Sequence, residues 1–255
     1  MARLLQDKVI IITGASSGIG AAAALRFANE GARLVLGARR GDTLRELAGQ
    51  ITQSNGHAIA VPGDVSDPDY AGQLVAAATD TFGGLDGALN NAGMLGSGAM
   101  VAETLQEDWD MVIATNLTAG YHAARAQIPA LKARGGGSLV FTGSFIGYTA
   151  TLPGMGAYAA SKAGLIGLVQ AIAVENGSDK IRANALLPGG TMTGMAMDAA
   201  TNPDTQAFIS GLHALKRIAD PAEIAAAALF LLSDLSSFVT GSAMLADGGN
   251  SISKV

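Results

Sequence analysis

The chain has 255 residues, of which 49% are hydrophobic and 15% are charged, and its formal net charge is −5. This composition supports a sizeable buried core and argues against a disordered chain, and the acidic balance argues against a nucleic-acid-binding protein, which usually presents a basic face. The chain has no cysteine, which excludes disulfides, thiolate metal sites and cysteine nucleophiles.

We expect no secretory signal in the first residues. The opening MARLLQDKVIIITG leads directly into a strand-like segment, and Asp7 and Lys8 interrupt any apolar region. No apolar run approaches the roughly 20 residues that a membrane span requires. We therefore expect a cytoplasmic protein that binds neither a membrane nor nucleic acid.

Short strand-like segments alternate along the chain with helical ones. The strand-like segments lie at 8–13, 33–37, 57–62, 85–90, 138–143, 181–187 and 242–247. Alanine- and leucine-rich segments with helical spacing, such as 20–31 and 42–56, separate most of them. This alternation indicates βαβ units and a parallel sheet covered on both faces. We therefore predict an α/β protein with a three-layer, doubly wound Rossmann fold and a parallel sheet of about seven strands.

Nothing in the sequence divides the chain into separate domains. It has no Pro/Ser-rich linker, charge run or solenoid-length repeat, so residues 1–255 are predicted to form a single domain. The alternation is interrupted after Pro188, where residues 189–217 form a long insertion before the next helix. Long excursions in compact domains are often lids or binding loops, so we expect a substrate loop here.

The first predicted strand leads into the glycine-rich sequence TGASSGIG, residues 13–20. In an open parallel sheet, ligands bind beyond the carboxyl ends of the strands. Gly14, Gly18 and Gly20 would let the backbone turn sharply and approach a ligand, and the N–H groups that open the next helix suit a pyrophosphate. The spacing differs from G-x-G-x-x-G, and a tight strand–helix connection is the alternative interpretation.

The segment GAYAASKAGLIGL, residues 156–168, places Tyr158 and Lys162 four positions apart. Four positions are about one helical turn, so the two side chains would lie on the same face of a helix. Taken alone, this pair could be a surface contact between a phenol and a lysine stem.

Six motifs occur together, in this order: TGASSGIG, NNAG at 90–93, Asn116 in TNLTAG, Ser144 in FTGS, YAASK at 158–162 and PGGTMT at 188–193. With these motifs the chain closely resembles the single-domain subgroup of the short-chain dehydrogenase/reductase family, from residue 8 to the terminal ADGGNS. The resemblance implies hydride transfer between a nicotinamide cofactor and a ketone or secondary alcohol. Ser144 and Tyr158 lie 14 positions apart, where the family more often has 13, which places an extra residue in the intervening loop.

The resemblance implies that the catalytic residues are Asn116, Ser144, Tyr158 and Lys162. Tyr158 would be the general acid in reduction and the base in oxidation, because Lys162 one turn away would lower the pKa of its phenol from about 10. Lys162 would also hydrogen-bond the nicotinamide ribose. Ser144 would hold the substrate oxygen, and Asn116 would hold a water that connects the lysine to solvent. On the residues alone, Ser144 could be a polar strand end and Asn116 a local backbone contact.

The end of the second strand indicates which nicotinamide cofactor is used. NAD-dependent enzymes generally place an acid there, whereas this chain has Ala38 followed by Arg39 and Arg40. Arginine recognises phosphate through a planar fork of donors, which suits the 2′-phosphate of NADP(H); two solvated arginines are the alternative. The resemblance implies that the cofactor is bound by Gly14, Ser16, Ser17, Gly18, Ile19, Gly20, Arg39, Arg40, Asp64, Val65, Asn91, Ala92, Gly93, Tyr158, Lys162, Pro188, Gly189, Thr191 and Thr193.

Methionines in the insertion and apolar side chains in neighbouring loops predict a pocket for bulky, apolar ketones. The predicted lining residues are Met94, Phe145, Tyr148, Leu152, Met192, Met195 and Met197. The alternative is that the methionines simply pack the insertion onto the domain. His57, His122 and His213 are scattered without ligand spacing, so we expect no metal site.

We therefore expect an NADPH-dependent carbonyl reductase, reversible as an alcohol dehydrogenase. The long helices around 104–133 and 156–176 have more apolar surface than one sheet face can cover, which favours a homotetramer. A 3-oxoacyl-[acyl-carrier-protein] reductase is the alternative, although its acidic carrier should need arginines where this chain has Glu175, Asp179 and one opposing Lys180. A non-catalytic NADP-binding regulator would be expected to have lost part of the catalytic set. An extended-type epimerase would need a second substrate domain.

Overall fold

A seven-stranded parallel sheet forms the centre of the computed structural model, which describes residues 3–194 and 202–253. The strands are β1 (Val9–Thr13), β2 (Arg33–Ala38), β3 (His57–Pro62), β4 (Gly87–Asn90), β5 (Gly137–Thr142), β6 (Ile181–Pro188) and β7 (Ala243–Ala246). Their order in the sheet is β3-β2-β1-β4-β5-β6-β7. Each strand begins and ends within two residues of its predicted segment, and the predicted doubly wound α/β fold is confirmed.

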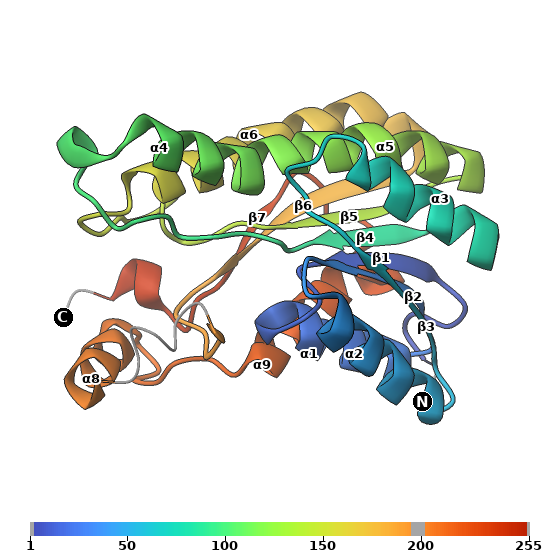
Figure 1. Ribbon diagram of the computed structural model, residues 1–255, viewed down its shortest axis with the longest axis horizontal. Helices are drawn as coiled ribbons and strands as arrows, with labels where there is room; N and C mark the ends of the chain where they lie inside the picture. The colour runs from blue at the N-terminus through green and yellow to red at the C-terminus, as the bar shows by residue number, and fades with distance from the viewer. Residues whose placement is uncertain (1–2, 195–201, 254–255) are drawn as a thin grey trace.

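Helices cover both faces of the sheet, which gives three layers (Figure 1). One face carries α1 (Gly18–Asn29), α2 (Gly41–Gln53) and α9 (Pro221–Leu232). The other face carries α3 (Tyr70–Phe82), α4 (Gln106–Ile113), α5 (Ala119–Arg134) and α6 (Gly156–Asn176). The helix α8 (Pro203–Leu212) belongs to the predicted insertion and lies apart from both layers, beyond the end of β6.

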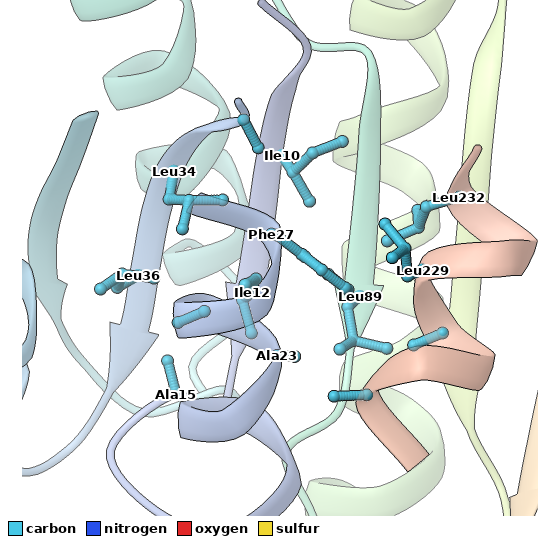
Figure 2. Packing of buried hydrophobic residues seen from close by; sticks show 14 of the residues in the cluster. Ile10, Ile12, Ala15, Ala23, Phe27, Leu34, Leu36, Leu89, Leu229 and Leu232 are labelled. Atoms are coloured by element: carbon cyan, nitrogen blue, oxygen red, sulfur yellow. The ribbon is translucent and has the colours of Figure 1, made fainter. Parts of the chain in front are cut away.

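Alternate residues of β1 fill two different cores. Ile10 and Ile12 belong to the core under α1 and α9, together with the fully buried Phe27 (Figure 2). Val9 and Ile11 belong to the core under α3, α5 and α6. All five residues of β1 are buried, as expected for a central parallel strand covered on both faces. Burial of each large apolar side chain contributes roughly 1.5–3 kcal/mol, so this continuous apolar run holds the layers together.

The helical segment predicted after residue 104 is divided by a change in its hydrogen-bond pattern. The helix α4 ends at Ile113, a π-helical turn covers Ala114–Thr118, and α5 begins at Ala119. Asn116 is buried within this turn. Because π-turns inside helices are frequent at functional sites, the position of Asn116 is consistent with a role beyond packing.

By length and composition, α6 is apolar enough to span a membrane, although the sequence analysis expected no such segment. In the structure its apolar residues instead pack against the sheet, where Leu165, Val169 and Ile172 are buried. The same helix carries the buried Lys162. Its apolar composition is therefore explained in part by its packing against the sheet, in the same layer as α4 and α5.

Arg182 of β6 fastens the C-terminal end of α9 to the sheet. Its guanidinium donates to the carbonyl oxygens of Leu231 (2.9 Å), Ser233 (3.1 Å) and Val239 (3.2 Å). The last carbonyls of a helix have no partner within the helix, and a cation is favourable at that end. Partial burial lowers the pKa of Arg182, so these carbonyls replace part of its lost hydration.

We predict that Arg182→Leu lowers the free energy of unfolding by about 2 kcal/mol, because buried carbonyls lose their charged donor. Urea unfolding at fixed protein concentration measures this loss. The control is Arg45→Ala, which removes an exposed ion pair with Asp42 (2.6 Å) and should cost less than about 0.5 kcal/mol. Equal midpoints for the two variants would contradict the assigned role of Arg182.

Candidate active site

The predicted site residues gather at the carboxyl ends of the strands. Because all seven strands are parallel, these ends meet at one edge of the sheet. The segments concerned are residues 14–20 after β1, 39–40 after β2, 64–65 after β3, 91–93 after β4, 144 after β5 and 188–193 at and after the end of β6. Tyr158 and Lys162 lie in the first two turns of α6.

The turn of residues 14–20 can form only with glycine at particular positions. Gly14 (φ +67°) and Gly18 (φ +53°) have left-handed backbone conformations. A Cβ atom on Gly20 would lie 2.3 Å from the carbonyl oxygen of Gly14, so the first turn of α1 packs directly on the turn before it. A glycine-rich turn without bulky side chains leaves the N-terminus of the following helix open to a ligand. This is the arrangement that binds the pyrophosphate of a dinucleotide. The residues present therefore fit such a cofactor.

Two arginines lie beside this turn, in different settings. The guanidinium of Arg40 donates to the hydroxyl oxygens of Ser17 (2.7 Å) and Ser16 (3.2 Å). The side chain of Arg39 is 80% exposed and lies 3.9 Å from the carboxylate of Asp64, a contact that contributes little at such exposure. The structure thus brings the two arginines, the two serines and Asp64 to the same corner of the strand ends.

Two buried threonines that the sequence analysis did not single out join the loops after β1, β4 and β5. The hydroxyl of Thr13 accepts from the N–H groups of Asn91 (2.9 Å) and Ala92 (3.2 Å). The hydroxyl of Thr142 donates to the side-chain oxygen of Asn91 (3.2 Å). A Cβ atom on Gly14 would lie 3.0 Å from the Cα atom of Ala92, so the two loops are in direct contact. Thr13 and Thr142 are each the last residue of an apolar strand, and this position in the sequence could have identified them.

Lys162 is the buried cation of the site. Its side chain is 3% exposed, and Nζ donates to the carbonyl oxygen of Thr142 at 2.7 Å. The same Nζ lies 5.6 Å from the centre of the Tyr158 ring, as expected for residues one helical turn apart. The side chain of Ser144 lies close enough to the phenol to lower its pKa. The loop between Ser144 and Tyr158 therefore brings the two together despite its extra residue.

Asn116 holds the loop after β4 against this group. Its side-chain oxygen accepts from the N–H of Met94 (2.8 Å), and its Nδ2 donates to the carbonyl of Met94 (2.9 Å) and to Ser161 (3.0 Å). A Cβ atom on Gly93 would lie 3.2 Å from the Asn116 oxygen and 3.3 Å from Nζ of Lys162. A side chain at residue 93 would therefore crowd both the amide oxygen of Asn116 and the ammonium group of Lys162.

A cavity of about 30 Å³ adjoins Asn116. Polar groups of Thr13, Asn90, Asn116, Gln127 and Thr142 form part of its wall. Asn90 and Gln127 exchange two amide hydrogen bonds of 2.9 and 3.0 Å there. Since a water needs about 10–15 Å³ of such volume and several polar partners, the cavity has room for one.

Burial determines the ionisation of the tyrosine and the lysine. It lowers the pKa of Lys162 to about 8. It also raises the pKa of Tyr158, which the nearby side chain of Ser144 lowers only in part. The expectation that Lys162 lowers the pKa of this phenol is therefore wrong for the structure as it stands, because desolvation has the larger effect and the ammonium group is directed at the Thr142 carbonyl.

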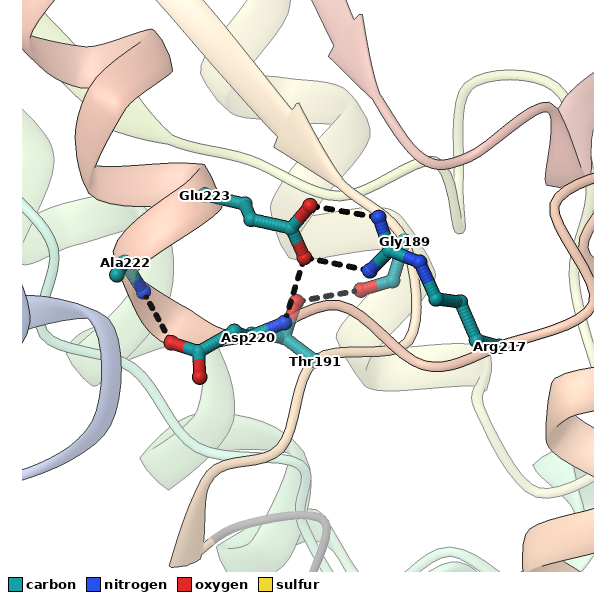
Figure 3. Close-up of polar contacts among 6 residues, drawn as sticks. All are labelled: Gly189, Thr191, Arg217, Asp220, Ala222 and Glu223. Atoms are coloured by element: carbon teal, nitrogen blue, oxygen red, sulfur yellow. Dashed lines mark hydrogen bonds and ion pairs between the residues drawn. The ribbon is translucent and has the colours of Figure 1, made fainter.

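The loop after β6 reaches back to the glycine-rich turn. A Cβ atom on Gly18 would lie 2.9 Å from the Cγ2 atom of Thr193, so the two segments touch. The hydroxyl of Thr191 donates to the carbonyl of Gly189 at 3.0 Å, a bond drawn in Figure 3. The N–H of Phe145 donates to the carbonyl of Pro188 (3.4 Å), which joins the loops after β5 and β6.

The predicted substrate-pocket residues are only partly described. Tyr148 (50%), Leu152 (37%) and Met192 (38%) are exposed, whereas Phe145 is buried. Met94 contacts Asn116 through its backbone, and Met195 and Met197 lie outside the described residues. Within residues 3–194 and 202–253, no group of three or more histidine, aspartate or glutamate side chains is placed to hold a metal ion.

Comparison with known proteins agrees with this geometry. The family model described as enoyl-(acyl carrier protein) reductase matches residues 14–251. The A-factor type gamma-butyrolactone 1'-reductase (1S-forming) of Streptomyces virginiae is 39% identical over 252 residues, which cover 98% of this chain and 97% of that protein. Cyclohexanol dehydrogenase of Acinetobacter sp. (strain SE19) is 35% identical over 248 residues, covering 97% and 96% of the two chains.

Solved structures give the same result. A short-chain type dehydrogenase/reductase from Mycobacterium marinum matches with a TM-score of 0.93 and 33% identity, covering 99% of this chain and 98% of that chain. The family model and the relatives thus span nearly the whole sequence, and the strand-end site contains the motifs that the sequence analysis identified. The chain therefore belongs to the short-chain dehydrogenase/reductase family.

Proposed function

We propose that the protein is an NADPH-dependent carbonyl reductase, reversible as an alcohol dehydrogenase. The observation that carries this proposal is the buried Lys162 beside Tyr158 and Ser144, at the same strand ends as a turn that fits a dinucleotide. Two relatives are named for reducing a gamma-butyrolactone and for oxidising cyclohexanol, which supports a ketone or secondary alcohol as substrate. Residues 1–255 would act as one cytoplasmic domain, with residues 189–217 as its substrate loop.

The strand-end loops would hold the cofactor, which supplies the hydride when bound. Residues 14–20 would bind its pyrophosphate, and Arg39 and Arg40 its 2′-phosphate. Asp64 and Val65 would flank the adenine, and residues 91–93 would line the adenosine ribose. Lys162 would bind the nicotinamide ribose, with residues 188–193 on the nicotinamide side.

Proton transfer would take place at the phenolic oxygen of Tyr158. Reduction of a ketone adds a proton to the carbonyl oxygen, and the phenol would donate it while the Ser144 hydroxyl orients that oxygen. In the reverse direction the phenolate would take the proton from the alcohol. Burial keeps the phenol protonated, so the positive charge of Lys162, 5.6 Å from the ring centre, would offset only part of the cost of forming the phenolate. Asn116 would hold a water that links this lysine to solvent; the cavity beside Asn116 also reaches Thr142, whose carbonyl Lys162 bonds.

The substrate would be an apolar and fairly bulky ketone. Tyr148, Leu152 and Met192 present exposed apolar surface in the loops after β5 and β6. Thioether and aromatic side chains adapt to varied apolar shapes. Met94, Phe145 and Met195 would complete the pocket.

A carrier-protein reductase is the second candidate, because the matching family model is described as an enoyl-(acyl carrier protein) reductase. An acidic carrier needs a basic docking surface. At the end of α6 and just after it, however, the chain has Glu175 and Asp179, and Asp179 already pairs with Lys132 at 2.8 Å. This charge pattern favours the free small-molecule ketone.

The protein would assemble as a homotetramer, since exposed large apolar side chains occur in two parts of the chain, each of which would form one patch. The first lies on and before α4 and α5 and contains Leu105, Trp109, Met111 and Tyr121. The second lies near the edge strand β7 and contains Leu235, Phe238, Leu245 and Ile252. Two self-complementary patches generate two different two-fold axes, and together these give a tetramer.

For the catalytic step, we predict that Tyr158→Phe nearly abolishes ketone reduction while NADPH binding survives, because only the proton donor is removed. Lys162→Ala should impair both, since it serves the phenol and the ribose. Turnover followed by NADPH absorbance, together with a fluorescence titration of NADPH, measures the two effects. Tyr121→Phe, at an exposed tyrosine of α5, is the matched control. Near-normal turnover in Tyr158→Phe would refute the mechanism.

For cofactor choice, we predict that Arg39→Ala weakens NADPH about 10- to 100-fold and leaves NADH almost unchanged. A charge-assisted hydrogen bond contributes roughly 1.5–3 kcal/mol. The Arg39 side chain is 80% exposed and directly follows the position of the missing acid, whereas Ser16 and Ser17 engage Arg40. Adding Ala38→Asp should repel the phosphate further. The test is the ratio of kcat/KM for NADPH to that for NADH, measured in the wild type and in each variant. Arg26→Ala is the control. A wild-type ratio below one would overturn the assignment.

For the assembly, we predict that the wild type is a tetramer by light scattering at micromolar concentration. Phe238→Glu should reduce it to a dimer, because a charge at this fully exposed ring blocks one patch and leaves the other intact. A monomeric wild type would contradict the two-patch assembly.

A further inference from the structure

His213, at the C-terminal end of α8, is a buried histidine with two backbone partners. Its ring is 2% exposed, with Nδ1 2.8 Å from the carbonyl oxygen of Ile209 and Nε2 2.9 Å from the N–H of Gly190. A carbonyl oxygen can only accept and a backbone N–H can only donate. The ring must therefore be neutral, with its proton on Nδ1 and a free electron pair on Nε2.

The imidazole packs directly on the backbone at the start of the loop after β6. A Cβ atom on Gly189 would lie 2.9 Å from Nε2 of His213, and one on Gly190 would lie 2.8 Å from Cε1. The two adjacent glycines thus make the space that the ring fills. Any side chain at either position would displace the ring or the loop.

Other bonds close the same loop at its far end. The N–H of Ala219 donates to the carbonyl of Gly190 (2.9 Å), and the N–H of Met192 donates to the carbonyl of Ala219 (2.9 Å). Next to them, Arg217 and Glu223 form a two-bond ion pair of 2.6 and 2.7 Å (Figure 3). His213 joins the end of α8 to this closed base through hydrogen bonds, and Ile209 of α8 packs beside it on Gly190.

We infer that His213 is a positioning residue for cofactor binding: its neutral imidazole holds Gly189 and Gly190 in place, and its protonation releases them. The role of that loop in binding the nicotinamide rests on the proposed function, whereas the contact itself does not. A protonated imidazole would present a second N–H to the N–H of Gly190. Two donors cannot bond to each other, so acid would remove the contact.

The charged groups around the ring do not offer another source of acid sensitivity. Asp247, Arg217 and Glu223 line the same groove as His213, and Lys216 follows on the chain, where its Nζ donates to a backbone carbonyl. The hydrogen bond from Arg217 lowers the pKa of Glu223 to about 2. Although burial opposes it, hydrogen bonds from residues 249 and 251 hold the pKa of Asp247 below its usual value.

Two variants separate the effect of the hydrogen bond between Gly190 and His213 from the effect of the ring's packing on the loop. His213→Leu keeps an apolar side chain of similar size but has no acceptor. His213→Gln keeps an acceptor and cannot be protonated in this range. His57→Gln makes the same change at an exposed histidine of β3 and serves as control.

The first measurement needs no cofactor. Hydrogen exchange of the peptide containing residues 189–191 is compared among the variants at pH 7.5 and at pH 5.5. We expect exchange in His213→Leu to be about ten times faster than in the wild type at pH 7.5, because the Gly190 N–H has lost its acceptor. We expect His213→Gln to remain close to the wild type. Equal protection in His213→Leu and the wild type would overturn the inference.

The second measurement is the dissociation constant of NADP⁺ at the same two pH values. The 2′-phosphate itself gains a proton near pH 6, and this effect is common to all variants. The comparison with His213→Gln therefore isolates the imidazole. We expect the wild type to lose at least fivefold more affinity on acidification than His213→Gln, with the His57→Gln control following the wild type. Parallel losses in the wild type and His213→Gln would overturn the inference.

The two measurements also distinguish this inference from the proposed function. If the proposed function were wrong, the wild type would not bind NADP⁺, yet exchange at residues 189–191 would still respond to His213. If the inference were wrong, the wild type would bind NADP⁺ while neither exchange nor acid sensitivity depended on residue 213. If His213→Leu does not fold, the pH comparison between the wild type and His213→Gln still decides.

Discussion

The hydrogen bond from the buried ammonium group of Lys162 to the carbonyl of Thr142 is the contact around which the site is arranged. Removing a charge from water is costly, and a single backbone carbonyl at 2.7 Å repays part of that cost. This contact ties α6 to the end of β5, and its energetic cost explains why the pKa of Lys162 falls to about 8. The π-turn at Asn116 and the bare backbone of Gly93 supply the remaining walls around the charge.

The strand ends form one connected rim because their loops approach one another without side chains. Gly14 touches the loop after β4, Gly18 touches Thr193 after β6, and Gly189 touches the imidazole of His213. At each contact, neighbouring backbone or side-chain atoms occupy the space that a Cβ atom would need. Because Thr193 in the loop after β6 touches Gly18, we expect a movement of that loop to shift the glycine-rich turn as well.

The fold and most of the site follow from sequence patterns, and the remaining features depend on backbone geometry. Apolar runs such as VIIIT identify central strands, and the four-residue spacing of Tyr158 and Lys162 identifies a shared helix face. The π-turn at Asn116 could not be predicted, because a shift in hydrogen-bond register leaves no mark in residue type. His213 bonds only to backbone groups, one of them 23 residues away, so its sequence neighbours do not reveal it. The rise in the pKa of Tyr158 depends on how deeply the phenol is buried, which the sequence does not reveal.

The most direct test of NADPH-dependent ketone reduction is kcat/KM of the wild type for cyclohexanone and for pyruvate, with NADPH consumption and alcohol product measured together at pH 7. We expect one alcohol formed for each NADPH oxidised, and a higher kcat/KM for cyclohexanone, because the exposed side chains of Tyr148, Leu152 and Met192 offer it apolar surface. No alcohol from a panel of apolar ketones, or far faster reduction of pyruvate, would contradict this function.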